Sequence, residues 1–379
     1  MERATELELI DELLGLKAQT SPFLDQNTAQ NPVSHYTSQE RFDRERSAIF
    51  KTLPHAVAHI SELKNPGDFI RCEAAGVPIL LTRTASGETR AFINACRHRG
   101  TRLVDDEKGC KRRFSCPYHA WTYANTGELL AAPHFDSGFP DQDKSELGLV
   151  ELECAERFGL VWVMPTPESA IDIDTLFAPL AEELTALGMA DLSVVADTTE
   201  TRSANWKILV EGGIEAYHFK VAHRSTIGPY FEDNLSSYRP YGPHMRAVLP
   251  RVSLADLDHD TRDSWRLRDH ANILYTLFPS TQLLVQQDHV VWIRSNPQGP
   301  GTTELRMTTL APPTDDAEHW QRNHTITTRT LDEDFVIGES MQATASSGAN
   351  DTMLFGRFEG ALATFNTTVN QYLDRETER

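Results

Sequence analysis

Two short segments of the chain each place one cysteine close to one histidine. The first reads CRHRG from Cys96, and the second reads CPYHAW from Cys116. A set of two thiolates and two imidazoles can bind zinc tetrahedrally, as in a structural zinc site. Zinc fingers, however, usually pair cysteine with cysteine and histidine with histidine along the chain. One of each per segment favours an iron–sulfur cluster in which both cysteines hold one iron and both histidines hold the other.

A second group of potential ligands lies at His218 and His223. Ferrous iron in oxygenases favours two histidines and one carboxylate on one face, which leaves positions open for dioxygen and substrate. Residues five apart on a regular α-helix point about 140° away from each other. The spacing therefore predicts a local break or widening of the helix between the two histidines. Taken alone, two unrelated surface histidines would give the same pattern.

With its flanking Arg-Gly, Pro-Tyr and Ala-Trp pairs, the first group has the Rieske pattern. Together with the second group, it resembles the catalytic (alpha) subunit of the Rieske non-heme iron oxygenases, of the ring-hydroxylating or quaternary-amine monooxygenase type, from about Phe50 to the C-terminus. The resemblance implies that Cys96 and Cys116 bind the inner iron of a 2Fe-2S Rieske cluster and that His98 and His119 bind the outer iron. The three remaining cysteines match no position of the pattern: Cys72, Cys110 and Cys154.

The carboxylate of the mononuclear Fe(II) site must come from elsewhere, and the acidic run over 331–339 is the best candidate. In the family this ligand is an aspartate in a helix of this type, and Asp334 matches its position. The resemblance thus implies His218, His223 and Asp334 as metal ligands. Helical spacing agrees, because small or apolar residues follow Asp334 at three, four and seven positions. Asp332 is the alternative, and acidic runs also occur on solvated helix faces.

Glu215 occupies the position at which relatives carry an Asp or Glu that links the two metal centres across a subunit boundary. A carboxylate can accept hydrogen bonds from a ligand histidine of each site and fix both tautomers. The resemblance thus implies a catalytic role for Glu215 and a homotrimer. In such a ring, His98 or His119 of one subunit would face His218 of the next.

The substrate is less constrained by the sequence. Relatives with Glu at the bridging position include those acting on carnitine, choline and betaine, which favours a methylated amine or betaine. Those relatives commonly read Glu-Asn-Tyr before the bridge and Cys after it, whereas this chain has Glu211-Gly212-Gly213 and Ala216. Paired glycines in a helix need a reason, such as a kink or extra room beside the iron, and an aromatic acid stays open as substrate. Five aromatic residues are candidates for a quaternary-ammonium cage or for the core: Trp206, Tyr217, Tyr275, Phe278 and Trp292.

The resemblance implies the oxygenase component of a multicomponent system, which uses dioxygen at the mononuclear Fe(II) to hydroxylate or oxidatively demethylate a small organic substrate. Aromatic ring cis-dihydroxylation is the alternative chemistry, and an electron-transfer protein with an inactive second domain is the alternative class. No Gly-x-Gly-x-x-Gly fingerprint occurs, so electrons from NAD(P)H must arrive through a partner, a ferredoxin and/or a flavin reductase. Basic residues around the cluster segments, interleaved with acidic ones, could attract an acidic partner: Arg97, Arg99, Arg102, Lys108, Lys111, Arg112 and Arg113.

These ligand groups require two kinds of domain. Short strands punctuated by Gly, Pro and Asn over 51–165 predict an all-β Rieske domain. Over 166–379, helical patterns (172–187, 205–223, 331–343, 355–373) and β-rich runs (281–285, 290–294, 304–310) predict a catalytic domain with an antiparallel sheet backed by helices. Helices over 1–50 would pack on it. The predicted class is α+β, and for the catalytic domain the resemblance implies a helix-grip (START-like) fold.

Composition narrows the remaining classes. The chain has 379 residues, of which 40% are hydrophobic, enough to build the cores of two domains. Its 36 Lys and Arg against 55 Asp and Glu give a net charge of −19, which argues against general binding to nucleic acid or to an anionic membrane. No apolar stretch approaches the roughly 20 residues of a bilayer span. With no visible secretory signal and five cysteines that form no disulfide framework, we expect a cytoplasmic protein.

Overall fold

The computed structural model describes residues 1–257, 259–313 and 316–377. Contacts within the chain group them into two compact units. One unit combines residues 1–49, 177–187 and 194–379, and the other combines residues 50–176 and 188–193. The domain limits at 50 and 165 stay predictions. The second unit begins at Phe50, continues beyond 165 to Leu176, and also includes residues 188–193.

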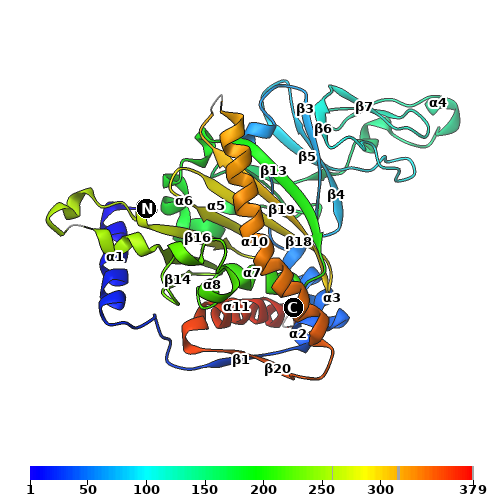
Figure 1. The fold of residues 1–379 in the computed structure, drawn as a ribbon. Helices are drawn as coiled ribbons and strands as arrows, with labels where there is room; N and C mark the ends of the chain where they lie inside the picture. Colours follow the sequence, from blue (N-terminus) through cyan, green and yellow to red (C-terminus); the bar gives the residue numbers. More distant parts are fainter. Residues whose placement is uncertain (258, 314–315, 378–379) are drawn as a thin grey trace. The chain divides into compact units, whose positions relative to one another are not determined.

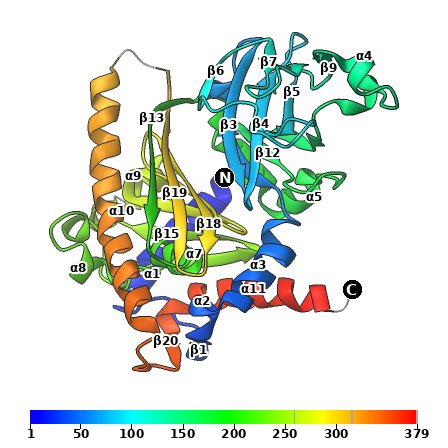
Figure 2. The same ribbon diagram turned by 90° about the vertical axis from the view of Figure 1, so that its right-hand side faces the viewer.

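The second unit consists mainly of short antiparallel strands (Figure 2). A five-stranded sheet has the order β10-β5-β4-β3-β6, and two three-stranded sheets have the orders β11-β12-β2 and β7-β8-β9. One buried cluster around Phe92 and Trp121 includes both Cys96 and Cys116, so the cysteines of the two cluster segments are rooted in the core. The strands are β2 (His55–His59), β3 (Asp68–Ala74), β4 (Val77–Arg83), β5 (Thr89–Ile93), β6 (Lys108–Cys110), β7 (Arg113–Ser115), β8 (Thr122–Ala124), β9 (Leu129–Ala131), β10 (Glu151–Leu152), β11 (Cys154–Arg157) and β12 (Leu160–Val163).

The first unit is built on a seven-stranded antiparallel sheet with the order β13-β19-β18-β17-β16-β15-β14. The three β-rich runs predicted from the sequence form its neighbouring strands β17, β18 and β19, which confirms the expected antiparallel sheet. The strands are β13 (Ser193–Arg202), β14 (Ser237–Tyr241), β15 (His244–Pro250), β16 (Ala271–Leu277), β17 (Thr281–Val285), β18 (Val290–Gly299) and β19 (Thr302–Ala311).

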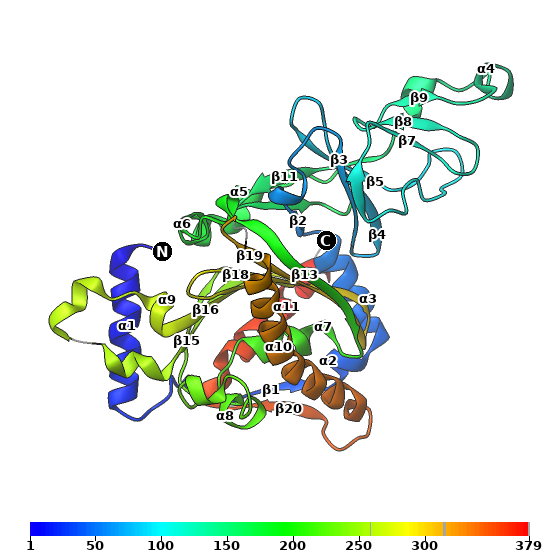
Figure 3. The ribbon, with the colours of Figure 1, turned by 45° about the horizontal axis from the view of Figure 1, so that its top comes forward.

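Helices α7 (Trp206–Gly213) and α10 (Ala317–Ala345) pack on one face of this sheet (Figures 1 and 3). Phe335 of α10 and Leu209 of α7 share a buried cluster with strand residues such as Ile293. Helix α10 begins well before residue 331, the limit predicted from the sequence. Asp316 caps its start by accepting a hydrogen bond from the His319 amide at 2.9 Å. Its first half is rich in threonine, a weak helix former, so the sequence gives little helical signal there.

The other helices are shorter than the sequence patterns suggested, except at the two ends of the chain. The predicted helix over 172–187 is divided into α5 and α6, and Phe355 ends strand β20 before α11 begins. The remaining elements are α1 (Arg3–Ala18), α2 (Ser34–Thr37), α3 (Gln39–Glu45), α4 (Phe135–Gly138), α5 (Ile173–Phe177), α6 (Ala181–Ala186), α8 (Phe219–Ala222), α9 (Leu267–His270), α11 (Gly360–Thr377) and the paired strands β1 (Ala29–Pro32) and β20 (Thr352–Phe355). Among the described helices, none combines the length and the apolar character needed to cross a membrane.

A buried ion pair joins α7 to α3. Both side chains, Lys207 and Glu45, are fully buried, and the Lys207 ammonium lies 2.8 Å from each Glu45 carboxylate oxygen. Trp206 Nε1 and Arg41 Nε also donate to Glu45, each at 2.9 Å. Because an ammonium group buried without a counter-charge is costly, the start of α7 depends on this carboxylate.

Replacing Glu45 with Ala should therefore destabilise the protein by about 3–5 kcal/mol, because it leaves Lys207 buried and uncompensated. Urea unfolding followed by circular dichroism measures the loss. The matched control is Glu318→Ala, since Glu318 pairs with Arg322 on an exposed helix face, and it should change stability very little. Equal effects of the two substitutions would show that the buried pair does not hold α7.

Candidate functional site

The segment that carries both candidate histidines is not a continuous helix. Helix α7 ends at Gly213, and α8 covers only the four residues between the two histidines. His218 lies directly before α8, and His223 lies directly after it. No regular helix contains both residues, which confirms the break predicted from their spacing.

The paired glycines end α7 close to the sheet. A Cβ atom at Gly213 would lie 3.2 Å from Nε2 of Gln282 and 3.3 Å from Cδ2 of Leu274. Glycine thus permits the end of α7 to approach strands β16 and β17. At Gly212, a Cβ atom would lie 3.8 Å from Cβ of Asp334, an ordinary contact distance. Close packing on the sheet is therefore the clearer requirement, and it is met by Gly213.

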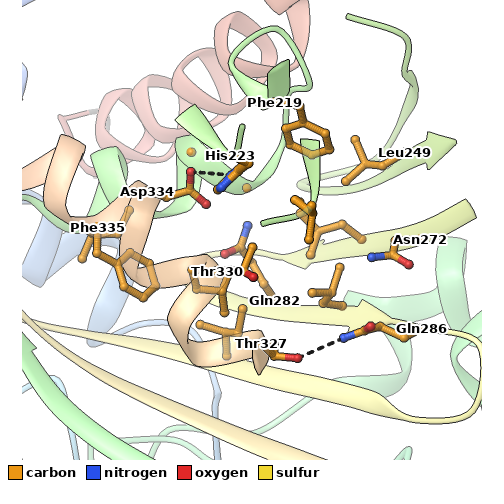
Figure 4. Close-up of a pocket in the computed structure, with 18 of the residues that line it drawn as sticks. Phe219, His223, Leu249, Asn272, Gln282, Gln286, Thr327, Thr330, Asp334 and Phe335 are labelled. Atoms are coloured by element: carbon orange, nitrogen blue, oxygen red, sulfur yellow. Dashed lines mark hydrogen bonds and ion pairs between the residues drawn. The ribbon is translucent and has the colours of Figure 1, made fainter. Parts of the chain in front are cut away.

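Three side chains converge on one point: Asp334 of α10, and His218 and His223 on either side of α8. Figure 4 shows two of them, His223 and Asp334. Oδ1 of Asp334 lies 2.9 Å from Nε2 of His223 and 3.2 Å from Nε2 of His218, and the two Nε2 atoms are 3.2 Å apart. Metal–nitrogen and metal–oxygen bonds are usually about 2.1 Å long, so three ligand atoms at these separations can share one ion. These atoms therefore fit a metal ion, and they are the ones implied by the resemblance.

In this triad of His218, His223 and Asp334, each imidazole has a glutamate at its other ring nitrogen, Nδ1. Glu215 hydrogen-bonds Nδ1 of His218, and Glu333 Oε2 lies 2.7 Å from Nδ1 of His223. A carboxylate at Nδ1 keeps the proton on that nitrogen and leaves the Nε2 lone pair free for a metal. Both histidines thus present the same atom to Asp334.

Glu333 was not predicted from the sequence, although it lies in the acidic run. The three consecutive acidic residues of α10 have different partners. Asp332, the alternative ligand, pairs with Arg202 at 2.6 Å, and the described contacts do not join it to either histidine. Glu333 also accepts from the Thr226 hydroxyl at 2.6 Å. One turn of helix therefore supplies a surface ion pair, a histidine support and the candidate ligand Asp334.

The charges of the triad couple metal binding to proton release. Burial lowers the pKa of His218, but hydrogen bonds with Asp334 and Glu215 outweigh burial and raise it to about 10. Burial also lowers the pKa of His223, but the hydrogen bond and the charge of Asp334 outweigh burial, so this pKa is raised as well. Burial alone would raise the pKa of Asp334, yet the two imidazoles hold it below its usual value. A cation that takes the Nε2 atoms must displace the imidazole protons.

His223 and Asp334 also line a mainly apolar pocket between α7, α10 and the sheet (Figure 4). Among the described lining residues, these two are the only ionisable ones. The aromatic lining consists of phenylalanines, and the polar lining is neutral. These side chains are Phe219, Phe231, Phe335, Asn272, Gln282, Gln286, Ser295, Thr327 and Thr330.

None of the five aromatic residues proposed for a substrate cage lines this pocket, so that interpretation is wrong for the described structure. Four of them are buried in packing contacts elsewhere, and the fifth, Tyr217, is 54% exposed. Trp206 binds Glu45, and the Tyr275 hydroxyl donates to Glu183 at 2.7 Å. Aromatic residues in a β-rich segment serve the core more often than a ligand, and their spacing does not distinguish the two.

The two cluster segments form loops with the same backbone hydrogen bonds. The Cys96 amide donates to Thr101 and the Cys116 amide to Trp121, each at 2.8 Å and each five residues ahead. Each cysteine carbonyl also accepts from the amide four residues ahead, at Gly100 and Ala120, both of which have positive φ. Two matched loops thus present two matched pairs of side chains.

The side chains of these loops separate by exposure. Cys96 and Cys116 are buried, whereas His119 is exposed and His98 partly exposed, and the Nδ1 atoms of the two histidines lie 3.1 Å apart. Buried thiolates and outer imidazoles fit a cluster with one inner and one outer iron. Cys72, Cys110 and Cys154 lie outside both loops.

Tyr123, which the sequence reasoning did not single out, contacts one of these thiols. Its hydroxyl lies 3.3 Å from Sγ of Cys96 and accepts from the Arg97 amide at 3.0 Å. Burial raises the pKa of Tyr123, so the hydroxyl keeps its proton and can donate it to sulfur. Hydrogen bonds to cluster sulfurs raise the reduction potential, because they stabilise the more negative reduced state.

Replacing Tyr123 with Phe should lower the reduction potential of the cluster by tens of millivolts, as measured by spectroscopic redox titration. Tyr118→Phe is the control, because Tyr118 is 55% exposed and its hydroxyl accepts from the Arg99 guanidinium at 3.2 Å instead of facing a cysteine sulfur. An unchanged potential in Tyr123→Phe would mean that this hydroxyl does not donate to the cluster.

Metal binding at the triad should depend on Asp334 and on pH. Asp334→Asn should weaken Co²⁺ or anaerobic Fe²⁺ binding at least about 100-fold, whereas Asp332→Asn should leave it within a few-fold. Because the imidazole pKa values are raised, affinity should increase from pH 6 to pH 8, with protons released on binding. Calorimetry in buffers of different ionisation enthalpy measures both effects. Equal losses in the two variants, or affinity independent of pH, would contradict the assignment.

Known protein families match both the region of the cluster loops and the region of the triad. Residues 54–151 match the Rieske [2Fe-2S] domain, and residues 189–375 match the ring hydroxylating alpha subunit (catalytic domain). The carnitine monooxygenase oxygenase subunit of Escherichia coli (strain K12) is 36% identical over 207 residues, which cover 54% of this chain and 53% of that protein. The glycine betaine monooxygenase oxygenase subunit of Pseudomonas aeruginosa is 33% identical over 192 residues, covering 51% and 44%.

The matched stretch spans about half the length of these curated relatives. A solved quaternary ammonium Rieske monooxygenase is similar over far more of the chain, with a TM-score of 0.78, 25% identity, and coverage of 91% of this chain and 96% of that one. Fold, cluster loops and catalytic segment thus agree with the resemblance seen in the sequence. The chain belongs to the Rieske oxygenase family, as a catalytic alpha subunit that joins a Rieske [2Fe-2S] domain to a ring-hydroxylating catalytic domain.

Proposed function

We propose that this chain is the oxygenase component of a multicomponent system that hydroxylates or oxidatively demethylates a small organic substrate with dioxygen. The convergence of His218, His223 and Asp334 beside an apolar pocket is the observation that carries the proposal. These three residues would hold Fe(II), and Cys96, Cys116, His98 and His119 would hold the 2Fe-2S cluster. When bound, the cluster supplies electrons one at a time and the ferrous iron activates dioxygen.

The protein's own residues would prepare the site for this chemistry. Glu215 and Glu333 keep the protons of the two imidazoles on Nδ1 and so direct both Nε2 atoms inward. Asp334 supplies one negative charge that partly offsets a divalent cation. The phenylalanines and leucines of the pocket exclude water and orient the carbon to be oxidised, since such a surface binds apolar groups.

An electron-transfer protein with an inactive second domain is the weaker alternative. Burying polar groups costs free energy unless each of them is hydrogen-bonded. An inactive domain would gain nothing from directing two supported imidazoles and a carboxylate at one point. Ring cis-dihydroxylation has specific support from the pocket, where the aromatic side chains are phenylalanines and no tyrosine or tryptophan is found among the described lining residues. An aromatic acid is therefore retained as a substrate class beside a methylated amine.

Electrons would reach the cluster from a ferredoxin or a flavin reductase that takes them from NAD(P)H. Members of this family act with partner electron-transfer proteins. The basic residues around the cluster loops are exposed, including Arg97, Arg99, Arg112 and Arg113. Lys111 is already paired with Asp106 at 2.7 Å. Among the described residues no carboxylate forms an ion pair with these four arginines, which makes them the better candidates for docking an acidic partner.

We also propose a homotrimer in which Glu215 links the two metal sites of neighbouring subunits. Inter-subunit electron transfer is described for a solved quaternary ammonium Rieske monooxygenase. Glu215 uses one oxygen for His218 Nδ1 and the other for the Tyr217 amide. Each carboxylate oxygen has a second lone pair, so Glu215 retains acceptor capacity for a histidine of another subunit.

The reaction is tested with a reductase, NAD(P)H and isotope-labelled dioxygen on carnitine, glycine betaine and a series of aromatic acids. Monooxygenation transfers one labelled oxygen atom to the product, and cis-dihydroxylation transfers two. Turnover of none of these compounds, together with oxygen consumption that no compound stimulates, would contradict the proposed activity.

The bridging role is tested by Glu215→Gln, with Glu333→Gln as the matched control. Both variants keep an oxygen acceptor at the Nδ1 of a ligand histidine, so both should retain metal. Only Glu215→Gln should slow single-turnover electron transfer, by about tenfold or more. Equal rates in the two variants would mean that Glu215 only supports His218.

A further inference from the structure

We propose that the pocket selects a substrate bearing a carboxylate, or a similar anionic oxygen group, at the end remote from the triad. Asn272 and Arg251 are the specificity-determining residues. The inference rests on the proposed function, because it names the substrate class of the same site. It concerns binding, however, and can be tested without turnover.

The pocket follows two neighbouring strands of the sheet. Side chains at alternating positions of β16 and β17 line it, as expected for one face of a sheet. Gln282 lies under the end of α7, where its Nε2 donates to the Val210 carbonyl at 3.2 Å. Gln286 is four residues farther along the chain, roughly 13 Å at the usual rise of a strand. The pocket is therefore long enough to separate the two ends of a small substrate.

Asn272 and Gln286 lie together at the remote end. The register of β16 and β17 pairs Ile273 with Val285, so the next residue on each strand, Asn272 and Gln286, are neighbours. Figure 4 shows both on one side of the pocket, with Asp334 on the other. Both side chains line the pocket, and both are neutral.

Arg251 lies behind this end of the pocket. Its Nη2 donates to Oδ1 of Asn272 at 2.9 Å, and its guanidinium lies 5.8 Å from the ring centre of Phe231, another lining residue. Nε of Arg251 is buried and has no hydrogen-bond partner. Over the described ranges, no carboxylate lies within 4.0 Å of this guanidinium.

A second arginine reaches the same end. Arg268 Nε donates to the Gln286 carbonyl at 2.7 Å, and no ion pair joins Arg268 to a described residue. The charges of Asp269 and Asp288 act on both arginines from farther away. Those carboxylates have nearer partners, since Asp269 accepts from Gln287 at 3.0 Å and Asp288 lies 2.7 Å from His289 Nδ1. Two positive charges thus lack a close counter-charge at one end of the pocket.

This arrangement suits an anionic oxygen group. Because the Asn272 oxygen is taken by Arg251, the free end of the amide is its NH₂ group, for which no described residue is an acceptor. A guanidinium bound to the oxygen polarises the amide and makes its N–H groups stronger donors. A carboxylate could accept from this NH₂ group and gain from both arginines, whereas a quaternary ammonium group at this end would be repelled.

The test compares ligands of one shape and different charge. Binding is measured by calorimetry on the anaerobic, iron-loaded protein for two matched pairs. One pair is 4-methylbenzoate and 4-methylbenzamide, and the other is γ-butyrobetaine, a carboxylate on a methylated amine, and its carboxamide. The better of the two carboxylates should bind about tenfold or more tightly than its own amide. Which of the two binds better identifies the rest of the substrate as aromatic acid or betaine.

Arg251→Met should reduce the preference for carboxylate over amide to within about twofold. Asn272→Asp is the second variant, because its carboxylate can pair with Arg251 and so preserve the local fold while repelling an anion. Arg266→Met is the control, since Arg266 is exposed and donates to the Trp265 carbonyl.

The proposal is overturned if neither carboxylate binds the parent protein better than its own amide does. It is also overturned if the preference survives in both Arg251→Met and Asn272→Asp, as it would if the iron held the carboxylate. A clear preference in a protein that oxidises no substrate would contradict the proposed function alone.

Discussion

The site depends on the packing of α10 against α7 and the seven-stranded sheet. The ligand candidates lie on segments more than a hundred residues apart, yet their atoms must stay within about 3 Å of one point to hold a metal ion. Phe335 follows Asp334 directly and is buried in the cluster that joins α10, α7 and the strands. A shift of α10 by one residue would turn Asp334 away from the histidines by about 100°. The apolar core therefore sets the geometry of a polar site.

The polar residues of the site form a layered set of supports. Asp334 is in contact with both imidazoles, a glutamate holds each imidazole from behind, and Thr226 in turn binds Glu333. Such supports restrict each ring to one orientation and one tautomer, which matters more for metal binding than the bare presence of histidine. The cluster loops follow the same principle in another form, because matched backbone hydrogen bonds orient each Cys–His pair.

Much of the fold and of the candidate site could be predicted from the sequence, wherever the spacing of residues along the chain determines the local geometry. The mixed Cys–His segments, the break between His218 and His223, and the antiparallel strands β17 to β19 all follow from local spacing and alternation. The resemblance then selected Asp334 over Asp332. What the sequence could not supply was tertiary: the support of His223 by Glu333, the contact of Tyr123 with Cys96, and the position of Arg251 behind Asn272. Each joins segments whose proximity only the packed fold defines, and the true extent of α10 was hidden by its threonine-rich first half.

The most direct test of the account is the metal content of the purified protein, measured with acid-labile sulfide and the EPR spectrum of the dithionite-reduced state. If the cluster loops hold a 2Fe-2S cluster and the triad holds iron, the protein should contain about three irons and two sulfides per chain after anaerobic ferrous loading, give a Rieske-type EPR signal, and lack stoichiometric zinc. A colourless protein with zinc and no sulfide would contradict this account. Such a result would leave the fold intact but remove the electron path on which the proposed oxygenase depends.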